Sequence, residues 1–295
     1  MTKNSALLAF GFGFMAAFFW GTHSVIVRYL TADLHGLTVA VLRLYIASAA
    51  LYVIMKLYRR PVSINFSDKT FWMVVIGVTS NYIFFHWGLE HTGASNAMML
   101  ENTAPFFVLA YLALVLRVAI RPIEVLASLL AIAGVYFTVR QDLAIGGEGL
   151  QGDLLEILAG ATWAIFLLGS SRALSETQST IERISFLFNV LFVSALLLTP
   201  LLLIYPPEIA KITANDAIFL LLLGIFPTAV ASWLWYEAAA RVSAVSATLL
   251  FTLSIIFTFV NAHLFLGEAL TWSMLIGAAL ILAGVILSKV GAKKS

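Results

Sequence analysis

The sequence contains no cysteine and little charge: only 11% of its 295 residues are Asp, Glu, Lys or Arg, whereas 61% are apolar. Soluble domains carry about 25% charged residues. The lack of cysteine excludes disulfides and thiolate metal sites, and a net charge of +2 provides no basic surface for nucleic acid. The core of a soluble protein cannot hold this much apolar surface, so we expect an integral membrane protein surrounded by a lipid bilayer.

Signatures of catalysis and of nucleotide binding are also missing. The sequence has no HExxH, no GxSxG, no glycine-rich phosphate loop and no potassium-type filter, and none of its Asp residues lies within an apolar run. These motifs supply the chemistry of metalloproteases, serine hydrolases, ATP-driven pumps and potassium channels. We therefore expect no enzymatic activity, no cofactor, no metal and no ATP hydrolysis by this chain.

Apolar runs dominate what the sequence does contain. A helix that crosses a bilayer needs about 20 mostly apolar residues. Ten runs meet this need: Ala6–Leu30, Gly36–Tyr58, Phe71–Leu89, Ala94–Leu116, Pro122–Val139, Leu154–Ala173, Ile184–Tyr205, Ala217–Tyr236, Ser243–Leu266 and Trp272–Lys289. The first is too long for the apolar segment of a signal peptide, so we interpret it as the first membrane helix.

One stretch occurs twice. Ala94–Val135 aligns with Ala244–Val285 without a gap, at a constant offset of 150 residues. The longest polar break, Arg140–Asp153, separates a first repeat (1–145) from a second (146–295). Five spans per repeat is an odd number, so the second repeat enters the membrane upside down. We predict an all-α integral membrane protein whose ten transmembrane helices form two inverted five-helix repeats around a central cavity.

The distribution of positive charge predicts the orientation. If the N-terminus is inside, most of the 17 Lys and Arg residues fall on the inner side, and Arg28, Arg140 and Lys211 fall on the outer side. Positively charged loops stay in the cytoplasm. We therefore expect a multi-pass protein of a bacterial inner membrane, with cytoplasmic N- and C-termini.

Several local motifs resemble those of the drug/metabolite transporter superfamily, in its EamA-type branch. They are Trp20-Gly21 in the first helix, the small-residue run 92–97, Pro105, and Phe265-Leu266-Gly267-Glu268. The resemblance extends over essentially the whole chain and, more narrowly, is to bacterial exporters of aromatic and other neutral amino acids. It implies a bundle with a central cavity. The first repeat departs from the pattern, because Arg117-Val118 replace the Gly-Glu pair.

Polar residues within membrane helices are costly, so each is a candidate for a site. Those singled out here are His23, Arg43, Asn81, His86, Glu101, Asn102, Asn189, Asn261 and His263. Pro105 cannot donate its amide and clashes with the carbonyl of Glu101, which predicts a kink beside this carboxylate. Glu101 can receive a substrate ammonium or a proton, or pair with a neighbouring helix. Arg43 can pair with Glu101, bind a substrate carboxylate, or extend to the outer surface.

The other polar candidates have similar alternatives. His23 lies one turn beyond Trp20, and His86 shares the third helix with Asn81. A histidine can carry protons near neutral pH, but it can also simply bridge two helices. Asn102 follows Glu101 at the predicted kink.

Aromatic residues supply candidate cavity walls. Trp20 and Trp163 are related by the repeat, and Tyr82, Phe85 and Phe251 are further wall candidates. An aromatic wall suits an aromatic or amphipathic ligand, and packing is the alternative. Trp residues near the ends of spans are expected to form interfacial belts: Trp72, Trp233, Trp235 and Trp272.

These residues support an exporter of neutral, including aromatic, amino acids that works by alternating access. The alternative is an exporter of amphipathic or cationic drugs, which needs only aromatic walls and one carboxylate. If Arg43 faces the cavity, a zwitterion is favoured over a cation. A channel or membrane scaffold is the third possibility. Gly13, Ala17 and Gly21 predict close packing of the first helix, and a monomer is favoured over an oligomer.

Overall fold

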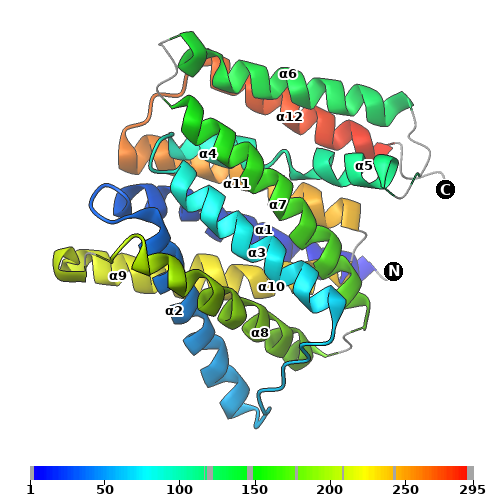
Figure 1. The fold of residues 1–295 in the computed structure, drawn as a ribbon. Helices are drawn as coiled ribbons and strands as arrows, with labels where there is room; N and C mark the ends of the chain where they lie inside the picture. Colours follow the sequence, from blue (N-terminus) through cyan, green and yellow to red (C-terminus); the bar gives the residue numbers. More distant parts are fainter. Residues whose placement is uncertain are drawn as a thin grey trace.

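The computed structural model describes residues 3–115, 117, 122–144, 149–176, 179–207, 209–241 and 244–290, and all the regular structure within these ranges is helical (Figure 1). The α-helices are α1 (Lys3–Leu30), α2 (Gly36–Leu57), α3 (Lys69–Gly88), α4 (Ala94–Glu101), α5 (Ala104–Leu114), α6 (Pro122–Ala144), α7 (Leu150–Glu176), α8 (Thr180–Leu198), α9 (Ala214–Leu223), α10 (Ala231–Ala239), α11 (Ala244–Asn261) and α12 (Trp272–Val290). Shorter elements are the 3₁₀ turns η1 (Thr199–Leu203) and η2 (Ile209–Lys211) and the π-helical segments η3 (Gly224–Val230) and η4 (Ala262–Leu266).

Local sequence signals set where several helices begin. The side chain of Asp68 accepts a hydrogen bond from the Thr70 amide at the start of α3. Ser179 and Glu182 form a reciprocal capping box at the start of α8. Such caps satisfy amide groups that have no partner within the helix. Pro122 opens α6, where its missing amide proton costs nothing.

The fourth predicted span is broken, as Pro105 predicts. α4 ends at Glu101 and α5 begins at Ala104, with Asn102 and Thr103 between them. The amide of Thr103 bonds to the carbonyl of Leu100 at 3.1 Å, a tighter turn than that of an α-helix. The break therefore lies beside the carboxylate of Glu101.

A second proline reshapes the segment between α9 and α10. Pro227 lies inside the π-helical segment η3 and cannot donate to the carbonyl of Leu223, four residues earlier. The hydroxyl of Thr228 donates to that carbonyl at 2.7 Å. Gly224 allows η3 to lie against α2, since a Cβ there would be 2.5 Å from Ile46 Cγ2. The sequence did not predict this π-helical segment.

The bundle is layered (Figure 1). α6 packs along α12 at one edge, α2 packs along α8 at the other, and α1, α3, α4, α7, α10 and α11 lie between them. α1 begins and α12 ends at the same end of the bundle (Figure 1). The main core combines residues from both halves of the sequence, including Trp20, Val78, Trp163 and Trp235.

Length and composition identify the chain as a multi-pass membrane protein. Five stretches of the described residues are long and apolar enough to cross a bilayer: Leu8–Leu30, Gly36–Leu57, Leu150–Leu174, Thr180–Leu203 and Ala214–Ala239. Shorter apolar helices cover Val125–Thr138, Phe251–Leu266 and Trp272–Gly284. Helices also lie over each of the other predicted spans. The arrangement as ten spans in two inverted repeats stays a prediction.

Candidate functional site

Side chains from α1, α2, α3, α4, α7, α8, α10 and α11 enclose a cavity of about 30 Å³. Its lining consists of Trp20, His23, Arg43, Val78, Asn81, Tyr82, Met98, Glu101, Trp163, Phe166, Leu187, Leu191, Ser232 and Phe251. A water molecule needs about 10–15 Å³ of such space, so the cavity has room for about two waters. Pockets that hold small molecules measure about 300–1,000 Å³, so this cavity is smaller than a typical ligand site.

Arg43 lies in this wall and does not extend to the surface, since its exposed fraction is 2%. Its Nε donates to Thr228 Oγ1 at 2.9 Å, and its Nη1 contacts Nε2 of both His23 and His86, the latter at 3.1 Å. The guanidinium also lies over the Tyr82 ring, 4.9 Å from its centre. Nη2 takes part in no hydrogen bond with a described residue.

The contacts of Arg43 also define the roles of the histidines. Nδ1 of His86 lies 2.9 Å from the carbonyl of Tyr82. A carbonyl can only accept, so Nδ1 carries the proton and Nε2 accepts from Arg43. Both histidines therefore hold the guanidinium between α1, α2 and α3, which is the interhelical role considered for them. Thr228, which was not among the predicted residues, holds it from η3.

Glu101 aligns with Phe251 when the two repeats are superimposed in sequence. Its side chain also lines the cavity. Asn81 donates to Glu101 Oε1 at 3.0 Å and to the carbonyl of Ala159 at 3.0 Å. These bonds join α3, α4 and α7. Within the described part of the chain Glu101 forms no ion pair with Arg43, and its Oε2 accepts no hydrogen bond. The cavity thus presents a carboxylate oxygen and a guanidinium nitrogen that are not bonded to each other.

Aromatic rings form the rest of the wall. Trp20 and Trp163 meet edge to face, with ring centres 5.9 Å apart and planes at 89°. Phe251 lies 5.2 Å from Trp20, and Phe166 stacks on Trp163 at 4.2 Å. Trp235 is 4% exposed and lies 6.3 Å from Trp20. The expectation that Trp235 belongs to an interfacial belt is therefore wrong: it supports this aromatic cluster from behind.

Three predicted residues lie beside the cavity and not in its wall. Phe85 is buried and stacks on His23 at 4.6 Å, and His86 bonds to Arg43. Asn102 turns back along its own chain and donates to the carbonyl of Met98 at 2.8 Å. Asn189, Asn261 and His263 also lie outside the wall, with Asn189 donating to the carbonyl of Ser63 and Asn261 to that of Gly21. The predicted residues that line the cavity are Trp20, His23, Arg43, Asn81, Tyr82, Glu101, Trp163 and Phe251. The wall residues absent from the prediction are Val78, Met98, Phe166, Leu187, Leu191 and Ser232. One of these, Phe166, could have been predicted from the sequence, because it aligns with the candidate His23 in the repeat.

Polar contacts close both ends of the bundle around the cavity. Where α3 passes into α4, the carboxylate of Glu268 accepts hydrogen bonds from the amides of Ala94 and Ser95 at 2.7 and 3.1 Å. At the same end the carboxylate of Glu90 accepts the amide of Gly36. These contacts join the end of η4 and the start of α2 to the α3–α4 connection.

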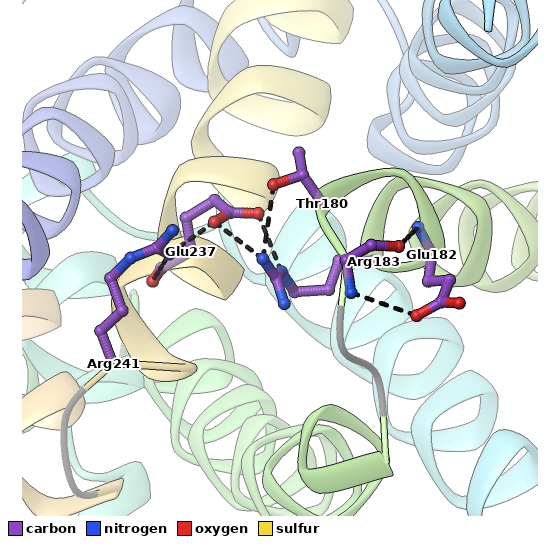
Figure 2. Close-up of polar contacts among 6 residues, drawn as sticks. Thr180, Glu182, Arg183, Glu237 and Arg241 are labelled. Carbon is purple, nitrogen blue, oxygen red and sulfur yellow. Dashed lines mark hydrogen bonds and ion pairs between the residues drawn. The ribbon is translucent and has the colours of Figure 1, made fainter.

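The opposite end, where α2 passes into α3, is closed by a buried ionic cluster. Figure 2 shows Glu237 of α10 between the guanidinium groups of Arg183 and Arg241. Arg183 binds both carboxylate oxygens, with distances of 2.8 and 3.0 Å, and also contacts Thr180. Arg241 lies over the Phe12 ring of α1. The cluster therefore connects α8, α10 and α1. Neither Arg183 nor Glu237 was a predicted site residue.

A second, larger cavity of about 500 Å³ lies between α2, α8 and η3. Its wall is apolar apart from Tyr58, Ser179, Thr180 and the indole of Trp233. A specific site needs a few convergent polar groups, and these gather around the smaller cavity. Among the described residues no group of three or more His, Cys, Asp or Glu side chains could hold a metal ion.

Charged side chains buried around an internal cavity are typical of membrane transporters. Within that class, the chain belongs to the EamA-like transporter family, whose model matches residues 7–140 and 150–290. The family therefore agrees with the resemblance drawn from Trp20-Gly21, Pro105 and Glu268.

Relatives and a solved structure extend this result. The chain is similar to an uncharacterized transporter of Clostridium kluyveri, with 26% identity over 75% of this chain and 71% of the relative. It is also similar to the uncharacterized transporter YwfM of Bacillus subtilis, with 26% identity over 96% of this chain and 94% of the relative. A protein crystal structure matches with a TM-score of 0.70 and 17% identity, over 100% of this chain and 99% of the other. This last likeness concerns the fold alone.

Proposed function

We propose that this protein exports neutral amino acids, aromatic ones included, by alternating access across a bacterial inner membrane. The observation that carries the proposal is the pair of free groups in one cavity: Arg43 Nη2 and Glu101 Oε2. A zwitterionic amino acid offers a carboxylate to the first and an ammonium to the second. Trp20, Trp163 and Phe251 form the wall that would receive the side chain.

The position of Arg43 favours a zwitterion over the alternative substrate class. An exporter of cationic or amphipathic drugs needs aromatic walls and a carboxylate, but a buried guanidinium repels a cation across a low-dielectric cavity. Because Arg43 lies in the cavity wall, a cation would enter against this repulsion. The neutral amino acid gains from both charges.

Helix contacts support an inverted repeat, as alternating access between two halves requires. The repeat relates α1 to α7, α4 to α11 and α3 to α10. The contacts obey this relation, because α1 packs on α11 as α7 packs on α4, and α3 packs on α7 as α10 packs on α1. On α6 and α12, a Cβ at Gly134 would lie 2.8 Å from the Gly277 carbonyl, and one at Gly284 would lie 2.6 Å from the Ala127 carbonyl. The offset of 150 residues relates Gly134 to Gly284 and Ala127 to Gly277, so the two contacts are equivalent under the repeat.

The cavity wall supports the same relationship. Trp20 and Trp163 are repeat partners, and so are Glu101 and Phe251. Both members of each pair line the cavity. A cavity on the repeat axis would bring partners together in this way.

The orientation follows from charge. We assign the end with Arg28 and Arg140 to the outside and the end with Arg183 and Arg241 to the cytoplasm, so that both termini are cytoplasmic. Relatives in Clostridium kluyveri and Bacillus subtilis support a bacterial membrane. One chain encloses the whole cavity, which supports a monomer as the working unit.

Counterflow in proteoliposomes tests the function. Vesicles loaded with unlabelled phenylalanine should take up labelled phenylalanine, threonine or methionine faster than empty vesicles, with saturation. Entry of a lipophilic cation such as tetraphenylphosphonium without entry of amino acids would instead support the drug exporter. Flux that neither saturates nor responds to substrate on the far side would contradict a carrier of any kind.

A further inference from the structure

One buried carboxylate has no part in the cavity described so far. Glu156 of α7 is 0% exposed, and neither of its carboxylate oxygens accepts a hydrogen bond within the described part of the chain. The group fills the space above Gly88 of α3, where an added Cβ would lie 2.5 Å from Oε1. An ionised carboxylate without partners is costly away from water, whereas a protonated one is tolerated. Its surroundings thus suit a group that carries a proton.

Glu156 stands between two other carboxylates along the parallel helices α4 and α7. At the outer end Thr92 donates to Asp153 at 2.7 Å. Deeper in the bundle, Gly160 lies against the backbone of Glu101. At a rise of 1.5 Å per residue, Glu156 is about 4.5 Å beyond Asp153 and about 6 Å before Gly160 along the helix axis.

Several titratable groups of the helices that pack on α7 are engaged elsewhere. On α3, His86 bonds to Arg43 and to the Tyr82 carbonyl. On α6, Arg140 donates to Ser273 of α12 at 2.8 Å. On α10, Glu237 binds Arg183 at the far end of the bundle. Asp153, one turn earlier on α7, and Glu101, whose backbone lies against Gly160, are the carboxylates that flank Glu156 along these helices. His91, whose backbone lies against Gly152, is the titratable group of the α3–α4 connection at the outer end.

We propose that Glu156 is a proton-binding site that couples export to the inward movement of a proton, passing it from the outer end near Asp153 to Glu101 in the cavity. This inference rests on the proposed function. In the transfer, which requires an intervening water, the O–H bond on Glu156 breaks and one forms on Glu101, so that a neutral acid replaces the carboxylate that held the substrate ammonium. The amino acid is then released outward. The proton leaves to the cytoplasm when the next ammonium binds Glu101.

Glu156→Gln tests this assignment, because glutamine keeps the shape and cannot deliver a proton. The protein is reconstituted in vesicles with an acidic lumen, and the membrane potential is clamped with valinomycin and equal potassium. For one proton exchanged per amino acid, each pH unit drives about tenfold accumulation of phenylalanine in the wild type. Glu156→Gln should only equilibrate phenylalanine, while its counterflow stays at the wild-type rate. A pH dye in the lumen should report substrate-dependent proton release from the wild type alone.

Two further variants separate coupling from folding. Glu156→Asp keeps a titratable group and should retain accumulation. Ser194→Ala removes another buried polar atom without a partner, on α8, and should match the wild type in both assays. Undiminished accumulation by Glu156→Gln would overturn the proposal, as would loss of counterflow in both Glu156 variants, which would indicate a structural role. Wild-type counterflow without accumulation would overturn the coupling and leave the proposed function standing. Absence of wild-type counterflow would refute the proposed function and, with it, this inference.

Discussion

The carboxylate of Glu268 accepts the amide of Ala94 at 2.7 Å, across 174 positions of sequence. Gly267 makes this contact possible, because its φ of 70° turns the chain into the left-handed region at the end of η4. A carboxylate at a helix N-terminus satisfies free amides and complements the helix dipole. Two motifs of the family resemblance, the start of α4 and the Leu-Gly-Glu segment, therefore form one contact, which holds the helix that carries Glu101.

Removal of this cap should lower stability. Glu268→Ala removes the acceptors of the Ala94 and Ser95 amides and should cost about 1–2 kcal/mol. Glu268→Gln keeps one acceptor oxygen and should cost less. Thermal unfolding of the purified wild type, Glu268→Ala and Glu268→Gln measures the order of their melting temperatures. Equal melting temperatures for all three would show that the contact contributes nothing to the free energy of unfolding.

Arg43 should distinguish a carboxylate-bearing ligand from an amine. Phenylalanine and phenethylamine share the ring and the ammonium, but only phenylalanine has a carboxylate. Arg43→Gln should weaken binding of phenylalanine by about 10- to 100-fold and leave that of phenethylamine unweakened. Arg43→Lys keeps the charge but loses the planar fork and should be intermediate. The affinity for each ligand is measured from its inhibition of counterflow. Equal losses of affinity for the two ligands would exclude a contact between Arg43 and the substrate carboxylate.

Trp163 should matter more for aromatic substrates than for small ones. Its ring meets Trp20 edge to face in the cavity wall. Aromatic pairs contribute about 0.5–1.5 kcal/mol beyond the area they bury. Trp163→Leu should therefore raise the KM for phenylalanine several-fold more than the KM for threonine. Trp272→Leu is the matched control, because Trp272 is 81% exposed, and it should leave both values unchanged.

Glu237 should be the most sensitive member of the ionic cluster in Figure 2. Its side chain is 2% exposed, whereas that of Arg241 is 29% exposed. Removal of one partner from a buried pair costs about 3–5 kcal/mol, and an exposed pair is worth about 1 kcal/mol or less. Glu237→Gln should thus lower the melting temperature much more than Arg241→Gln. The reverse order would mean that the cluster is hydrated.

Much of the helix pattern could be predicted, because apolar runs and their breaks are properties of the local sequence. The predicted starts at Gly36, Ala94, Pro122 and Trp272 agree with the structure. Pro105 predicted the break after Glu101, since proline lacks a backbone amide proton wherever it lies in a helix. The π-helical segment around Pro227 could not be anticipated, because it depends on the hydroxyl of Thr228 and on close packing against α2.

Part of the cavity wall was predicted, from polar residues that are costly in lipid and from aromatic residues within the spans. Arg43, Asn81 and Glu101 were singled out because polar side chains within a membrane span are energetically costly. Trp235 was assigned to an interfacial belt because its place near the end of a span does not reveal which face of the helix it occupies. Glu156 lies inside a predicted span but was not singled out, and its isolation from hydrogen-bond partners is visible only in three dimensions.

Gly21 and Gly11, on the same helix, should respond oppositely to an added methyl group. A Cβ at Gly21 would lie 2.2 Å from Phe257 Cβ and 3.1 Å from its Cα, whereas one at Gly11 meets nothing within 4 Å. Overpacking costs about 1–3 kcal/mol, so Gly21→Ala should lower the melting temperature. It should also weaken transport, because α1 carries Trp20 and α11 carries Phe251. Gly11→Ala should be neutral or slightly stabilising, since alanine favours the helix.

The clash at Gly21 also predicts which second substitution relieves it. The nearest atom is the Cβ of Phe257, which alanine retains and glycine lacks. Phe257→Gly should therefore recover part of the stability lost in Gly21→Ala, and Phe257→Ala should not. The coupling is measured as the difference between the double variant and the sum of the single variants. Since the ring of Phe257 also packs against Phe14 and Phe18, both single variants at 257 lose the same ring contacts. Their contrast in the Gly21→Ala background isolates the Cβ, and equal coupling for the two would show that α1 and α11 do not approach each other as closely as the structure has them.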